Sequence, residues 1–148
     1  QLKILIISTA WMVFRAVGSI LFLVWTVMGS LRSATPEWIV AFTSDFFIGI
    51  TALFLTYQII NKPTALLWGI LLAWDTLGIF DLVGALSLTV TSPFQPIPEI
   101  GLNGIGVRVV LNINNFIQVI TLGLMFSSQI RSHFKIWSRK NLSKKQTQ

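Results

Sequence analysis

The sequence predicts an all-α protein, a polytopic bundle of four transmembrane helices. Of its 148 residues, 53% are hydrophobic and 11% are charged, whereas soluble domains carry about 25% charged residues. The mean hydropathy is +0.74. Four stretches are long and apolar enough to cross a bilayer, which takes about 20 residues of helix. Helices are one of the two structures that satisfy their own backbone hydrogen bonds in lipid.

The first predicted span covers residues 4–28. It resembles a signal peptide in position, but it is too long for an apolar signal region and carries Arg15 at its middle. We therefore expect a helix that is retained. The next three predicted spans cover residues 38–60, 64–90 and 105–129.

The connections between the spans contain helix-breaking residues. Residues 29–36 hold a glycine and a proline, and residues 61–63 form a tight turn that ends on Pro63. Proline suits the start of a helix because the backbone N–H that it lacks would have no partner within the first turn. Three prolines within residues 91–104 forbid a continuous helix. We therefore predict a transmembrane domain over 1–130 and a basic tail over 131–148.

The basic residues predict the orientation of the chain. The side that holds both termini carries Lys3, Lys62, Arg131, Lys135, Arg139, Lys140, Lys144 and Lys145. The opposite side has Arg32, with Arg108 just inside it. By the positive-inside rule, both termini of this multi-pass protein face the cytoplasm of a cell membrane. Attraction to anionic lipid explains the basic tail more simply than nucleic-acid binding does.

The composition excludes several classes of chemistry. The chain has no cysteine and a single histidine, His133, which rules out disulfides, thiolate metal sites and bis-histidine haem sites. No metalloprotease, hydrolase or phosphate-loop motif is present. The lysines of the predicted bundle, Lys3 and Lys62, lie at its edges, where they do not suit a retinal Schiff base. We predict no enzymatic activity and no cofactor.

Ionisable and amide side chains inside the spans predict a buried polar cluster. A charged group at the bilayer centre costs at least ~2.5–3.5 kcal/mol, so these residues are expected to face one another. If Arg108 extends to the interface, the excess of acid leaves at least one aspartate protonated. The predicted cluster is Arg15, Asp45, Asp75, Asp81, Arg108, Asn112 and Asn115. The last three form one polar stripe along the fourth span, and Asn114 and Gln118 lie beside this stripe.

Helical spacing refines this prediction. Asp75 precedes Asp81 by six residues, which places the two about 120° apart around the helix. We therefore expect them to have different partners. Glycines near the charged positions predict close helix packing, since they let a partner helix approach. These glycines are Gly18, Gly49, Gly78 and Gly84.

One segment resembles a known family. Residues 73–83 read AWDTLGIFDLV and are followed by Thr91-Ser92-Pro93. This run is similar to the A-W-N-x-x-G-x-x-D-L-V and S-P pattern of a family of uncharacterised bacterial multi-spanning membrane proteins. Two shorter patterns, Arg15 with Gly18 and Ser44-Asp45 with Gly49 and Ala52, are similar to the same family.

The resemblance implies shared positions and additional helices upstream, but no activity. The shared positions are Arg15, Asp45, Gly49, Gly78 and Asp81. Asp75 stands where the family pattern has asparagine. This departure favours Asp45 and Asp81 over Asp75 as functional acids.

Two functions remain open. The first, which small-residue faces and short loops favour, is a non-enzymatic accessory or structural subunit that packs against other membrane helices. The alternative is a homo-oligomeric transporter or channel, coupled to protons or ions through the buried arginine and aspartates. The charges would then line a polar cavity that opens to the non-cytoplasmic side. In the subunit, buried ion pairs would only fix the helix register.

Overall fold

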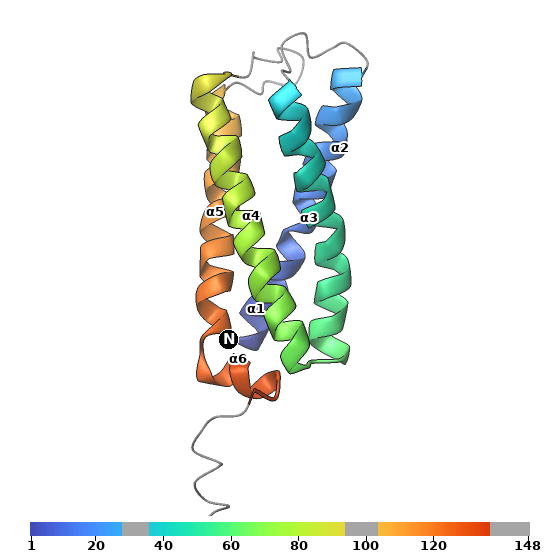
Figure 1. Cartoon of the computed structure of the whole chain (residues 1–148), viewed down its shortest axis with the longest axis vertical. Coiled ribbons are helices and arrows are strands. Elements are labelled where there is room, and N and C mark those ends of the chain that lie inside the picture. The colour runs from blue at the N-terminus through green and yellow to red at the C-terminus, as the bar shows by residue number, and fades with distance from the viewer. Residues whose placement is uncertain (28–35, 94–103, 137–148) are drawn as a thin grey trace, which may run out of the picture.

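A computed structural model describes residues 1–27, 36–93 and 104–136 (Figure 1). Within these residues all regular structure is helical, and four segments are long and apolar enough to span a membrane. The predicted fold class is therefore confirmed. Arg32 and the predicted tail beyond residue 136 lie outside the described residues. The helices are α1 (Leu2–Trp11), α2 (Val13–Val27), α3 (Pro36–Asn61), α4 (Ala65–Thr91), α5 (Gly104–Met125) and α6 (Ser128–His133).

The first span differs from the prediction because it is broken at Met12. The backbone N–H of Met12 bonds to Thr9 O at 3.2 Å, and that of Arg15 bonds to Met12 O at 3.0 Å, a tighter spacing than the α-helical one. Upstream, the hydroxyls of Ser8 and Thr9 both donate to Leu5 O. Such back-bonding bends helices. The span therefore consists of two helices, α1 and α2; both contact α3, and α1 also contacts α5.

The bundle consists of two helix pairs joined along part of their length. Helix α2 packs on α3, α4 packs on α5, and α3 also contacts α4. At the end that holds the N-terminus, α1 contacts both α3 and α5 and closes the bundle (Figure 1). At the other end α2 and α5 do not pack closely on each other. The break at Met12 thus separates a closed half from a more open half.

The fourth span also ends earlier than predicted. Helix α5 stops at Met125, and the short helix α6 follows after a turn. The Ser127 hydroxyl caps α6 by accepting from Ile130 N at 3.3 Å. Ile130 and Phe134 are fully buried against Leu5 and Leu71. The folded chain therefore continues past residue 130, where we predicted the tail to begin.

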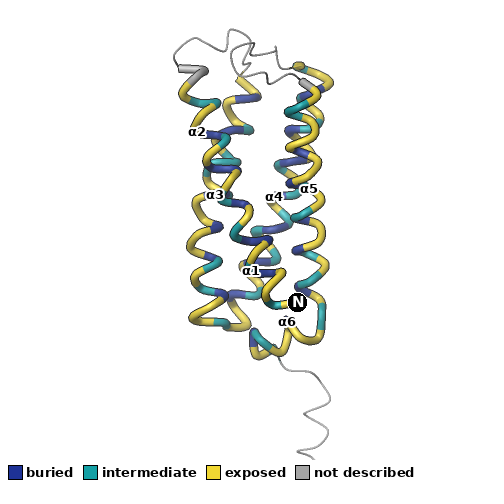
Figure 2. The backbone as a smooth tube through the Cα atoms, turned by 180° about the vertical axis from the view of Figure 1, so that it is seen from behind, coloured by how far each residue is buried: buried dark blue, intermediate teal, exposed yellow. Residues whose placement is uncertain are grey.

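Two apolar clusters lie on either side of the polar centre. The cluster near the N-terminus joins α1, α3, α4, α5 and α6. The second cluster contains Trp38, Phe42, Leu82, Ala85 and Leu111. Figure 2 shows that exposed residues cover most of the outer surface of the helices, and many of them are large hydrophobics. This distribution suits a bundle surrounded by lipid.

Candidate functional site

Arg15 is at the centre of a buried network of hydrogen bonds. The residue is only 3% exposed. Its Nε donates to Asp45 Oδ1 at 2.6 Å, and its NH1 group donates to Gln118 Oε1 at 3.0 Å and to Gly78 O at 3.5 Å. Its NH2 group pairs with both Asp45 and Asp81. All three guanidinium nitrogens therefore contact acceptors within the protein, through four hydrogen bonds and the ion pair of NH2 with Asp45.

The network connects all four membrane spans. Arg15 comes from α2, Asp45 from α3, Asp81 from α4 and Gln118 from α5. The second oxygen of Asp81 accepts from the Ser44 hydroxyl. With both aspartates ionised, the group carries one more negative than positive charge. Of the seven residues of the predicted cluster, the structure thus brings together three: Arg15, Asp45 and Asp81.

Asp75 lies apart from this network. The residue is 1% exposed, and neither carboxyl oxygen has a hydrogen-bond partner among the described residues. Gln118 and Arg15 are close enough to interact with it electrostatically, but the Gln118 amide nitrogen is also buried without a hydrogen-bond partner there. Asp75 and Asp81 therefore have different surroundings.

The polar residues of α5 are arranged differently from the prediction. Asn112 is exposed and donates to Arg108 O within its own helix. Asn115 is half-buried, and its side-chain oxygen bonds to no described residue. The buried amides are instead those of Asn114 and Gln118. They belong to the buried face formed by Leu111, Asn114, Gln118, Thr121 and Met125. The alternating spacing of three and four residues along this face is typical of one side of a helix, and it could have identified Asn114 and Gln118 from the sequence.

Arg108 also lies away from the central network. Its Nε donates to Thr89 Oγ1 at 3.1 Å, and its NH2 group donates to Thr89 O at 2.8 Å. Arg108 is exposed and makes no ion pair with a described residue. Its position near the start of α5 explains this, because the guanidinium remains close to the end of the span.

Only two of the four predicted glycines lie at a close helix contact. A Cβ added to Gly49 would collide with the backbone of Ala16, and one added to Gly78 would collide with the Gln118 amide. A Cβ on Gly18 or Gly84 would meet no atom within 4 Å. Gly49 therefore lets α2 approach α3, and Gly78 makes room for the amide that binds Arg15. Within the described residues of this chain, neither Gly18 nor Gly84 lies at a close helix contact, so a packing role for them stays a prediction.

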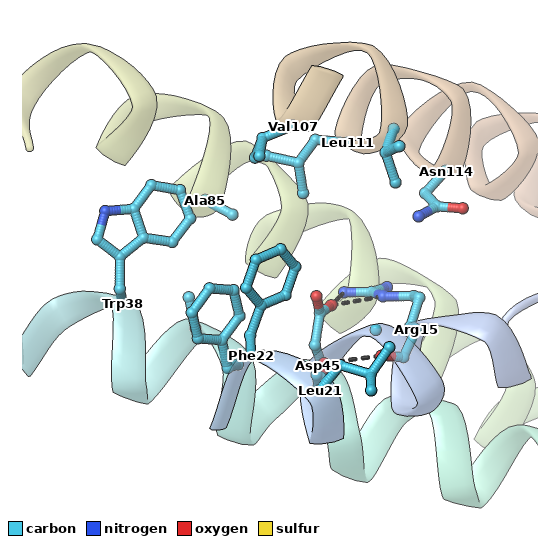
Figure 3. Close-up of a pocket in the computed structure, with 14 residues that line it drawn as sticks. Arg15, Leu21, Phe22, Trp38, Asp45, Ala85, Val107, Leu111 and Asn114 are labelled. Carbon is cyan, nitrogen blue, oxygen red and sulfur yellow. Dashed lines mark hydrogen bonds and ion pairs between the residues drawn. The ribbon is translucent and has the colours of Figure 1, made fainter. Parts of the chain in front are cut away.

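A cavity of about 240 Å³ adjoins the network, between the α2–α3 pair and the α4–α5 pair. At one end it is bounded by Arg15, Asp45 and Asn114, and toward the other by the rings of Phe22 and Trp38 (Figure 3). Helices α2 and α5 both line it without packing closely on each other, which leaves the cavity partly open on that side. The ion pair therefore borders a space that can hold a small molecule.

Asn114 has a defined orientation at the polar end of the cavity. Trp11 Nε1 donates to Asn114 Oδ1 at 3.0 Å, so the amide oxygen faces α1. The amide nitrogen points the other way. The sequence places Asn114 beside the polar residues of the fourth span, but it does not pair Asn114 with Trp11, because the two lie 103 positions apart.

The described residues contain no group of three or more histidine, aspartate and glutamate side chains that could hold a metal ion. The polar centre is therefore a site of ion pairs and hydrogen bonds next to an apolar cavity. In comparisons with protein families, with curated proteins and with solved structures, nothing matches this chain.

Proposed function

We propose that this chain is a non-enzymatic membrane protein that binds a small solute in the cavity beside Arg15 and Asp45. In this proposal it works as a homo-oligomeric carrier or channel coupled to protons or ions. The observation that supports the proposal is the position of the ion pair at the wall of a 240 Å³ cavity.

The proposed orientation places both termini in the cytoplasm of a cell membrane. Lys3, Lys62, Arg131 and Lys135 are all exposed, and the segments that carry them lie at the end of the bundle that holds the N-terminus (Figure 1). An excess of lysine and arginine on one side is typical of the cytoplasmic side. Anionic lipid would then contact this end and the basic tail. The cavity, in the opposite half, would lie nearer the outside.

A flux measurement tests the proposal. The purified chain is placed in liposomes that contain a pH-sensitive dye, and proton, sodium or potassium gradients are imposed. We expect a flux above that of empty liposomes, and we expect Asp81→Asn to reduce it because this change removes one of the two charges that hold Arg15. Arg108→Gln is the matched control, since Arg108 contacts Thr89 and not the network.

Folding of each variant is checked by its thermal unfolding in detergent. A flux that stays at the level of empty liposomes under all three gradients would refute the carrier. Equal loss of flux in Arg108→Gln and Asp81→Asn would also count against it, because the network would then have no special role.

The second candidate is an accessory or structural subunit of a membrane complex. Three glycines support it: Gly69, Gly84 and Gly123 are exposed, and a Cβ on any of them would meet no atom within 4 Å. Small residues on an outer face let a helix of another chain approach closely. Native mass in mild detergent, with identification of bound proteins by mass spectrometry, separates the two candidates. Unlike membrane proteins in fixed ratio favour the subunit, and a defined homo-oligomer favours the carrier.

A further inference from the structure

We infer that the cavity binds a small amphipathic amine, in which one compact apolar group, such as a single ring, is joined to an ammonium group and a hydroxyl. This inference rests on the proposed function in one respect, because it takes the cavity to be a ligand site. It goes further by naming the chemistry of the ligand from the unused polar atoms at the cavity wall.

The charge of the site favours a cation over an anion. Every guanidinium nitrogen of Arg15 already contacts acceptors of the protein, and its charge is held by two aspartates, so Arg15 is not available to pair with a carboxylate or phosphate. Asp45 accepts both of its contacts with Arg15 on Oδ1, and its side chain remains 17% exposed. Its other oxygen, Oδ2, accepts no hydrogen bond from the described residues. An ammonium group can donate to this oxygen and balance the excess negative charge.

Asn114 requires a hydrogen-bond acceptor on the ligand. An indole N–H only donates, so the bond from Trp11 fixes which end of the amide is oxygen. Asn114 is 9% exposed and lines the cavity, and its Nδ2 donates to no described residue. An ammonium group has no lone pair for this donor, whereas a hydroxyl has two. A ligand with both groups would use Asp45 and Asn114 together.

The remaining wall selects an apolar body of limited size. The rings of Phe22 and Phe42 stack with centroids 4.7 Å apart, and Trp38 stacks on Phe42 at 5.6 Å. A cavity of about 150 Å³ binds benzene, so 240 Å³ accommodates one ring with a short side chain.

Binding to the full chain in detergent, measured by titration calorimetry, tests this inference. The probe is 2-amino-1-phenylethanol. Three compounds serve as comparisons: 2-phenylethylamine lacks the hydroxyl, 1-phenyl-1,2-ethanediol replaces the ammonium with a hydroxyl, and mandelate replaces the aminomethyl group with a carboxylate. We expect the amino alcohol to bind at least about tenfold more tightly than the diol, since hydrogen bonds to charged groups are the stronger ones. We expect 2-phenylethylamine to be intermediate and mandelate not to bind.

Variants locate the binding in the cavity. Asp45→Asn should abolish the preference for the amino alcohol over the diol, whereas Asp75→Asn, which changes an acid outside the cavity lining, should retain it. Gly18→Leu should abolish binding, because Gly18 lines the cavity and its Cβ position is open. Gly84→Leu is the matched control, with an open Cβ position outside the lining.

The outcomes distinguish this inference from the proposed function. If none of the four compounds binds the unmodified chain, the inference fails, whereas the proposed function is decided separately by the flux measurement. If the diol or mandelate binds as tightly as the amino alcohol, only the ligand class is overturned. Unchanged binding by Gly18→Leu would show that the ligand does not occupy this cavity. This test remains valid even if Asp45→Asn fails to fold.

Discussion

Arg15 determines whether the buried charges of this protein are compensated. Its guanidinium is the common partner of Asp45, Asp81 and Gln118. Removing one member of a buried ion pair leaves an unpaired charge and typically costs 3–5 kcal/mol. We therefore expect Arg15→Met to lower the free energy of unfolding by about 3–5 kcal/mol, measured by denaturant titration in mixed micelles.

Two comparisons show whether this loss comes from the unpaired acids. Arg108→Met removes a guanidinium whose hydrogen bonds to the described residues all go to Thr89, and it should cost no more than about 1.5 kcal/mol. Combining Arg15→Met with Asp45→Asn and Asp81→Asn should recover much of the stability, because no charge is then left unpaired. A triple variant as unstable as Arg15→Met alone would contradict this explanation.

The close approach of α2 to α3 depends on Gly49. A methyl group there would lie 2.6 Å from Ala16 Cβ and 2.9 Å from Ala16 Cα, and the backbone of α2 cannot move away without disturbing Arg15 one residue earlier. Overpacking of this kind costs about 1–3 kcal/mol, so Gly49→Ala should lower the free energy of unfolding by that amount. Gly84→Ala, whose Cβ position is open, should be neutral or slightly stabilising. Equal stability of the two variants would refute the close contact.

Helix lengths and helix packing differ in how well they follow from local sequence. The bounds of α3 and α4 agree with the predicted spans to within two residues, because hydropathy and the prolines at the ends act locally. Pro63 precedes α4, and Thr64 caps it by accepting from Leu67 N at 3.1 Å. The break at Met12 was not predicted, since it depends on hydroxyl-to-backbone bonds of Ser8 and Thr9 that many continuous helices also contain.

The orientation of the entire bundle can be tested with single cysteines, because the chain has none. Lys62 and Thr91 are exposed at opposite ends of α4. In intact cells, a membrane-impermeant maleimide should label Thr91→Cys at once and Lys62→Cys only after permeabilisation, because the basic end is expected in the cytoplasm. The reverse pattern would place the cavity half of the protein on the cytoplasmic side.

Hydropathy, charge and length were enough to predict four helical spans and a set of ionisable residues that had to compensate one another. These properties depend on the chemistry of each segment and on the thickness of a bilayer. They also predicted that the five ionisable residues within the spans face one another, since each is costly alone in lipid, and the structure brings three of these, Arg15, Asp45 and Asp81, together. None of these predictions depends on how the helices are rotated about their axes.

The rotation and tilt of the helices determined which of the polar residues meet and where the cavity lies. They turned Asn114 and Gln118 inward in place of Asn112 and Asn115, left Asp75 outside the Arg15 network, and separated α2 from α5 so that a cavity formed beside the ion pair. Each of these results depends on contacts between segments far apart in the chain. Such contacts are set by the packing of all the helices at once, and no single segment contains that information.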